Sequence, residues 1–154
     1  MPDGLYERDA FAWAEQQATL LSRLAAGERL NGDVDWEHVI EEVRDVGLSE
    51  LHRCESLLTR AMTHLLKIHM WPDSQAVAHW RGEIASLLVG AQRNFTPSMR
   101  QRIDMADLYA NALYAARVEA GTAGEKLPEA CPFTQNDLLA HQPDIAKLLS
   151  KIEP

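Results

Sequence analysis

The chain has 154 residues, of which 46% are hydrophobic and 25% are charged. These proportions are typical of a soluble globular protein and too apolar for intrinsic disorder. The formal net charge is −8, so nucleic acid is a poor candidate partner, since its phosphates require a basic surface. No run of about 18 apolar residues occurs, and we expect no membrane-spanning segment. The length predicts a single domain over residues 1–154.

The two cysteines predict a reducing environment. Cys54 and Cys131 lie far apart and neither belongs to a Cys-x-x-Cys motif, which indicates two free thiols. The first residues, MPDGLYERDAF, contain neither a basic patch nor an apolar run, so we expect no signal peptide. These features together favour the cytoplasm.

Helical spacing of apolar residues predicts a first helix from about Leu5 to Ala26. Gln17 is a polar residue in the middle of its apolar face. If Gln17 is buried, it needs hydrogen-bond partners, because an unsatisfied buried polar group costs roughly 1–3 kcal/mol. The predicted inner face consists of Tyr6, Ala10, Trp13, Gln17, Leu20, Leu21 and Leu24.

A second helix is predicted to follow the polar loop of residues 28–35, with Asp35 as its N-cap. Gly47 interrupts its pattern and Ser49 can cap a new helix, so we expect a break or kink near Gly47. The predicted buried face consists of Trp36, Val39, Ile40 and Val43. The opposite face is acidic and carries Glu37, Glu41, Glu42 and Asp45.

Residues 49–70 show the longest helical pattern, and their apolar positions cover almost half of the helix circumference. A face this wide contacts more than one neighbour, which predicts a central helix of a bundle. Trp71-Pro72 ends the pattern, since proline disfavours a helical residue before it. A basic stripe of Arg53, Arg60 and Lys67 lies opposite the apolar face, with His64 at its border.

The remaining sequence predicts two more long helices and a short helical appendage. The long helices are expected over residues 74–95 and 97–120, the second beginning at Thr96-Pro97. Thr134 with Asp137 resembles a capping box for a short helix, and another short helix is expected over residues 145–152. The fold class predicted is all-α, an antiparallel helical bundle of about five helices with a short helical C-terminal appendage.

Four segments resemble, in this order, a bacterial family known as "domain of unknown function 29". They are YERDAFAWAEQQATLL, VDWEHVIEEVRDVGLSELHRCESLLTRAMTHLLKIHMWP, AHWRGEI and LPEACPFT. The family often has more tryptophan and tyrosine where this chain has His69-Met70-Trp71. The resemblance implies a helical bundle and supplies no activity, ligand or catalytic residue. The residues that fit the family pattern are Asp9, Trp13, Gln17, Asp35, Trp36, Glu41, Glu42, Gly47, Ser49, His64, Lys67, Trp80 and Cys131-Pro132.

Motifs for metal binding and catalysis are absent from the sequence. Di-iron bundles use Glu-x-x-His pairs, whereas this chain has only Asp35-x-x-His38. His64 and His69 are five residues apart and face directions about 140° apart on a helix, so they cannot share an ion. Neither a Gly-x-Ser-x-Gly elbow nor a glycine-rich phosphate loop occurs. We therefore expect no metal and no cofactor, and a non-enzymatic role is favoured without being decided.

The charged faces of the predicted helices allow two interpretations. In the first, the acidic residues pair with the basic stripe as structural ion pairs, inside the bundle or along its surface. The acidic members are Glu41, Glu42 and Asp45, and the basic members are Arg53, Arg60 and Lys67. In the second, four polar residues converge into a pocket for a small anion or for a partner's acidic side chain. These candidate site residues are Gln17, Glu42, His64 and Lys67.

The function expected from these features is that of a small helical protein acting through protein–protein contacts, as an adaptor or regulator. Residue types that interfaces favour occur at Trp13, Trp71, Trp80, Arg81 and Arg93. One alternative is a small-molecule-binding or metal-dependent bundle enzyme. Another is one component of a two-gene regulatory pair, such as a toxin–antitoxin module, in which the acidity suits a basic partner. A homo-oligomer is compatible with each of these roles.

Overall fold

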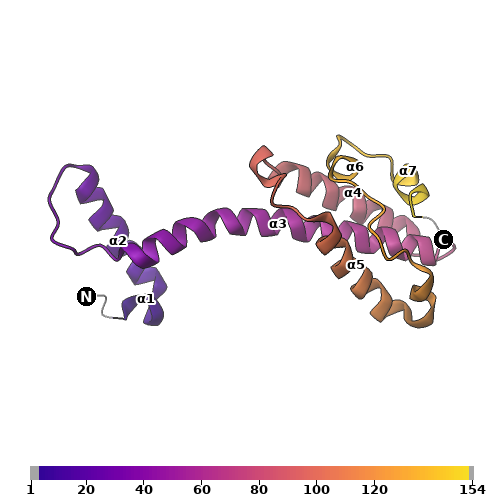
Figure 1. Ribbon diagram of the computed structural model, residues 1–154, viewed down its shortest axis with the longest axis horizontal. Helices are drawn as coiled ribbons and strands as arrows, with labels where there is room; N and C mark the ends of the chain where they lie inside the picture. The colour runs from indigo at the N-terminus through magenta and orange to yellow at the C-terminus, as the bar shows by residue number, and fades with distance from the viewer. Residues whose placement is uncertain (1–3, 153–154) are drawn as a thin grey trace. The chain divides into compact units, whose positions relative to one another are not determined.

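The computed structural model describes residues 4–152, which form seven α-helices, two short 3-10 helices and no strand (Figure 1). The prediction of an all-α fold is confirmed. The chain divides into two compact units, an N-terminal unit of residues 1–48 and a C-terminal unit of residues 49–154. Helix α3 begins in the first unit and continues into the second. The prediction that residues 1–154 form a single domain stays a prediction. No helix within residues 4–152 has both the length and the apolarity needed to cross a membrane.

The N-terminal unit begins with two helices, where the sequence predicts one. Helix α1 covers Leu5–Arg8 and helix α2 covers Ala10–Ala25. Asp9 separates them, with φ −154° and ψ 84°, and its carboxylate accepts a hydrogen bond from the backbone N–H of Ala12 at 3.0 Å. The prediction of one helix from Leu5 to Ala26 is therefore wrong at Asp9, because this side chain serves as the N-cap of α2.

Helix α3 is continuous from Trp36 to Met70 (Figure 1). The predicted break near Gly47 is wrong, and Ser49 lies inside the helix rather than at its start. A glycine in a helix interior costs only about 1 kcal/mol relative to alanine, which the turns on either side can offset. A Cβ atom added at Gly47 would meet nothing within 4 Å.

The first turns of α3 have an exposed apolar face. The relative exposures of Trp36, Ile40 and Val43 are 52%, 48% and 69%, and Val46 is similarly exposed. The prediction that Trp36, Ile40 and Val43 are buried is wrong, although the helical spacing itself is correct. The pattern identifies an apolar face but does not identify what covers it.

In the C-terminal unit, helix α4 covers Val77–Asn94 and runs back along α3 (Figure 1). The Cys54 thiol donates to the Ala91 carbonyl, with an Sγ–O distance of 3.5 Å. A Cβ atom added at Gly90 would lie 3.3 Å from the Leu57 side chain, so the glycine allows the close approach of α3 and α4. The largest fully buried side chains of this unit include Leu58, Met62, Leu65, Leu66, Ile84, Leu88, Tyr109 and Leu138.

Helix α5 begins later than the sequence predicts. Pro97–Met99 form the 3-10 helix η1, and α5 covers Met105–Ala120. The Asp104 carboxylate accepts hydrogen bonds from the backbone N–H groups of Ala106 and Asp107 and so caps α5. The predicted helix over 97–120 is therefore wrong over its first eight positions (97–104), where Asp104 provides the stronger start signal.

The predicted C-terminal appendage is present. A 3-10 helix η2, Gly121–Lys126, leads into the irregular chain before helix α6, Gln135–Leu139. Thr134 and Asp137 form the predicted capping box, and helix α7 covers Ile145–Ser150. The Gln92 side chain on α4 donates to the carbonyl groups of Leu138 and Ala140 at 3.3 and 2.6 Å, which fixes α6 against α4.

The continuity of α3 can be tested at Gly47. Substituting Gly47→Ala adds a methyl group that meets no atom and reduces the conformational freedom of the unfolded chain. We expect an increase of about 0.5–1 kcal/mol in the free energy of unfolding. Gly32→Ala is the matched control and should destabilise the protein, since Gly32 has a φ of 75°. Urea denaturation measures both, and a destabilising Gly47→Ala would contradict a continuous helix.

Candidate functional site

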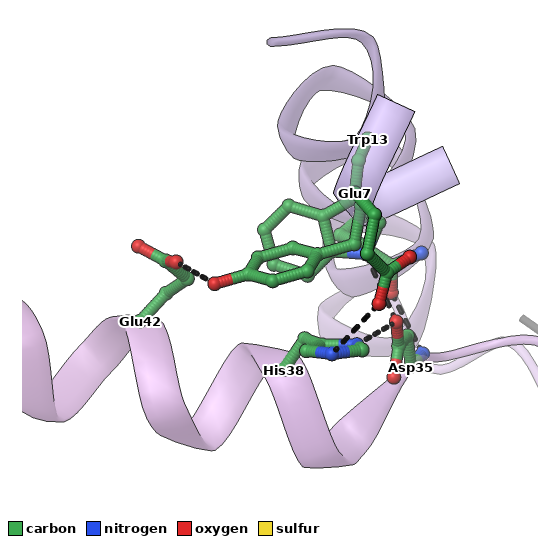
Figure 2. Close-up of polar contacts among 7 residues, drawn as sticks. Glu7, Trp13, Asp35, His38 and Glu42 are labelled. Atoms are coloured by element: carbon green, nitrogen blue, oxygen red, sulfur yellow. Dashed lines mark hydrogen bonds and ion pairs between the residues drawn. The ribbon is translucent and has the colours of Figure 1, made fainter. Parts of the chain in front are cut away.

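The Asp35 carboxylate lies at the centre of a polar network in the N-terminal unit (Figure 2). Asp35 immediately precedes α3, and its side chain is 9% exposed. Its Oδ2 atom accepts a hydrogen bond from the Trp13 indole at 3.1 Å and lies 2.7 Å from Nδ1 of His38. The backbone N–H of Asp35 donates to Oε1 of Gln17 at 2.8 Å. One residue therefore connects α2, the loop before α3 and the first turn of α3.

A second set of contacts joins α1 to the same part of α3. The ring of Tyr6 stacks on that of His38, with centroids 3.9 Å apart and an interplanar angle of 18°. The Tyr6 hydroxyl donates to Oε1 of Glu42 at 2.6 Å. Oε1 of Glu7 lies 3.7 Å from Nε2 of His38, so the imidazole has a carboxylate at each nitrogen (Figure 2).

These contacts shift the pKa values of three groups. The hydrogen bond to Asp35 raises the pKa of His38, against the opposing effect of burial. Burial raises the pKa of the Asp35 carboxyl, but the hydrogen bonds from His38 and Trp13 outweigh it and lower the pKa. The hydrogen bond to Glu42 raises the pKa of Tyr6 to about 12. The network therefore favours a carboxylate at Asp35 and a protonated imidazole at His38.

A cavity of about 450 Å³ lies beside this network, a size in the range of small-molecule sites. Residues of α1, α2 and the loop before α3 line it, among them Trp13, Gln16, Arg23 and Asp33. Its wall thus combines an indole ring with side chains of both charges. Within residues 4–152, no cluster of three or more His, Cys, Asp or Glu side chains is arranged to hold a metal ion.

Lys67 and His64 belong to a different cluster, in the C-terminal unit. The Lys67 side chain is 13% exposed, and its Nζ atom lies 3.0 Å from Oε1 of Glu119. The same Nζ atom lies 4.7 Å from the ring centroid of Trp80. Nδ1 of His64 is buried without a hydrogen-bond partner, and burial together with the Lys67 charge lowers the pKa of this imidazole.

The four residues predicted to form a pocket are divided between the two units, and each contacts residues of its own unit. Gln17 and Glu42 belong to the polar network of the N-terminal unit, and His64 and Lys67 belong to the C-terminal unit. Gln17 is buried and its amide oxygen has the partner that burial requires, as predicted. The convergence of all four on one ligand stays a prediction.

Three of the charged residues predicted as structural ion pairs have other partners. Glu42 accepts from Tyr6, and Lys67 pairs with Glu119. Arg53 lies 3.9 Å from Glu50, one turn earlier on α3. Glu42 and Lys67 thus have partners that are distant in the sequence, whereas the partner of Arg53 is local.

A model of one protein family matches residues 5–142, which is most of the chain, and its description is "Domain of unknown function DUF29". The chain belongs to this family. The resemblance noted in the sequence is confirmed, and the matched range contains both polar clusters described above. Membership in the DUF29 family carries no assigned activity.

A solved structure extends the DUF29 comparison. The chain is similar to an alpha-helical protein of unknown function from Rhodospirillum rubrum, with 30% sequence identity and a TM-score of 0.73. The similarity covers 97% of this chain and 98% of that one, so it supports the all-α fold over nearly the full length. Among curated proteins, none matches the chain.

The sequence did not identify the roles of His38, Tyr6 and Glu119 in this DUF29 chain. Tyr6 and Glu42 are 36 residues apart, and Lys67 and Glu119 are 52 positions apart, so no local spacing indicates either pair. One signal was present for His38, since Asp35 and His38 are three residues apart at the start of a helix. That spacing places both side chains on one face, where they form a hydrogen bond.

The hydrogen bond between Gln17 and the Asp35 backbone can be tested with neighbouring glutamines. Gln17→Leu leaves the Asp35 N–H without its acceptor, and we expect a loss of about 1–3 kcal/mol in unfolding free energy. Gln16→Leu, at an exposed position, is the control and should change stability by less than about 0.5 kcal/mol. Urea denaturation measures both variants, and equal effects would contradict the role of Gln17.

The ion pair of His38 predicts a pH-dependent stability. Because the folded-state pKa of His38 is raised, its contribution is complete below the unfolded pKa of about 6.5 and is lost as the pH rises through the folded pKa. The pKa of Asp35 is lowered, so its contribution is present above the unfolded pKa of about 3.9 and is lost on acidification. The melting temperature of His38→Asn should fall further below wild type at about pH 5.5 than at about pH 9.

Circular dichroism melts measure this difference, and an NMR titration of the His38 ring identifies its source. Asp35, Glu7 and Glu37 are the acidic groups that raise the pKa of His38. Asp35→Asn should lower the His38 pKa clearly and Glu7→Gln less, because the Glu7 contact is longer and more exposed. A His38 pKa that does not respond to Asp35→Asn would contradict the assigned cause.

Proposed function

We propose that the N-terminal unit binds a positively charged amphipathic helix of a partner protein, and that the protein acts in the cytoplasm as an adaptor or regulator. The apolar face at the start of α3, formed by Trp36, Ile40, Val43 and Val46, carries this proposal. In the described structure, Cys54 and Cys131 are free thiols, which suits a reducing compartment.

The geometry of this face suits a helix as its occupant. Trp36, Ile40, Val43 and Val46 are spaced by four, three and three residues, so they follow one side of α3 for about 15 Å. A second helix buries such a stripe along its own apolar side, as in helix-in-groove recognition. Trp36 provides an aromatic anchor of the kind that dominates interface energies. The face therefore fits an amphipathic helix better than an extended segment.

The negative charge of the N-terminal unit favours a partner with a positive charge. Residues 1–48 contain eleven Asp and Glu residues and four Arg residues, a formal charge of −7, whereas the remaining residues carry −1. Glu37, Glu41 and Asp45 lie on the face of α3 next to the apolar stripe. A basic helix would meet complementary charges, which steer association and exclude other partners. A second copy of this chain would instead bring another acidic unit against the first.

Model peptides test the proposal directly. A labelled amphipathic peptide of leucine and lysine, about 18 residues long, should bind with a Kd that rises at least tenfold, by about 1.4 kcal/mol, in Val43→Asp. Val118→Asp is the matched control, since Val43 and Val118 are both 69% exposed and Val118 lies on α5. Fluorescence anisotropy measures the affinity. Two further peptides, one with glutamate in place of lysine and one with scrambled order, should bind weakly.

Three results would overturn the proposal. Equal binding of the scrambled peptide would indicate charge attraction without an apolar face. Equal binding to Val43→Asp would place the peptide elsewhere. A reversible dimer in sedimentation velocity that Val43→Asp dissociates would identify a second copy of the chain as the occupant.

A further inference from the structure

Lys67 shows that one end of the C-terminal unit accommodates a cation. Its ammonium group lies over the ring of Trp80 and contacts the Glu119 carboxylate at 3.0 Å. Trp80 comes from α4, Glu119 from α5 and Lys67 from α3, so three helices contribute to this arrangement. An aromatic face attracts an organic cation through the quadrupole of the ring, and a carboxylate attracts it by its opposite charge.

A cavity of about 460 Å³ extends from the same two groups. Trp80 and Glu119 form part of its wall, and Trp71 provides a second indole, with ring centroids 6.3 Å apart and planes tilted by 40°. Met70, Pro72, Asp73 and Ser74 complete the lining. The lining therefore includes two indole side chains and the acidic residues Glu119 and Asp73, and the cavity lies outside the network of the N-terminal unit.

We propose that this cavity binds a small alkylammonium compound, with the cationic head against Trp71 and Trp80 and in contact with Glu119. The negative faces of the indole rings and the carboxylates of Glu119 and Asp73 disfavour an anion at this position. A neutral ligand of the same shape would gain the apolar contacts but neither the cation–π contact nor the ion pair. The selectivity for positive charge is thus the property that identifies the site, and it does not depend on the docking surface of α3.

Lys67 competes with such a ligand. Its ammonium already uses the Glu119 carboxylate and one Trp80 ring, so a bound cation shares both groups with it. Removing the lysine charge should increase the affinity for a cation, whereas removing the Glu119 charge should decrease it. A purely structural role of the Lys67–Glu119 pair would instead make both substitutions act in the same direction.

The experiment titrates the full chain with choline and with 3,3-dimethylbutan-1-ol, its uncharged isostere, at constant ionic strength. The indole N–H signals of Trp71 and Trp80 in two-dimensional NMR report occupancy, and those of Trp13 and Trp36 serve as controls. We expect the Kd for choline to rise about three- to tenfold in Glu119→Gln and to fall by a similar factor in Lys67→Met, the range for one charge or cation–π contact. The isostere should bind more weakly than choline by at least about threefold.

Each other result overturns the proposal. Equal binding of the isostere means that the cavity recognises shape alone. Changes of the same sign in Glu119→Gln and Lys67→Met assign the pair to structure. If the Trp71 and Trp80 signals do not change when choline is added, choline does not bind in the cavity. The same spectra verify that both variants are folded, and Glu119 is an exposed residue whose substitution leaves the packed interior of α5 in place.

Discussion

The Asp35 carboxylate is the interaction on which the N-terminal unit depends. This unit has few buried side chains, since Trp13 and Gln17 are the only residues of α2 that are buried. A small apolar interior provides little stabilisation, so directed hydrogen bonds contribute a larger share of it. Asp35 provides them to Trp13 and His38 through its side chain and to Gln17 through its backbone. A carboxylate that is 9% exposed requires such partners, because an unpaired buried charge is strongly destabilising.

The small interior of the N-terminal unit also explains the exposed face at the start of α3. The side of α3 that carries His38 and Glu42 contacts α1 through Tyr6, and the side that carries Trp36 and Val43 remains exposed. Helices α1 and α2 provide too little surface to cover both sides of α3. In the C-terminal unit, by contrast, Leu58, Met62 and Leu65 of the second half of α3 are fully buried. One helix therefore has a covered half and a half with an open apolar face.

The sequence predicted the elements better than their boundaries and their neighbours. Apolar periodicity identified the helices, and Thr134 with Asp137 identified the cap of α6. The predicted helix boundaries were wrong where two local signals competed. Asp9 and Asp104 are the N-caps of α2 and α5, whereas apolar periodicity alone predicted that each helix begins before its cap. At Gly47 the error was the opposite one: a break was predicted where the helix continues. A helix interior tolerates one glycine.

The candidate sites were less predictable because their partners are distant in the sequence. Periodicity places Trp36 and Leu58 on apolar faces in the same way, yet only Leu58 is buried. What distinguishes them is which helix packs alongside, and this is a property of the folded unit. The Lys67 contact to Glu119 likewise depends on where α5 crosses α3. Both proposed sites favour a cation, but their electrostatics differ. Charge spread over residues 1–48 acts at a distance and is screened within about 10 Å at 0.1 M salt, whereas the Glu119 carboxylate and the Trp80 ring act on contact.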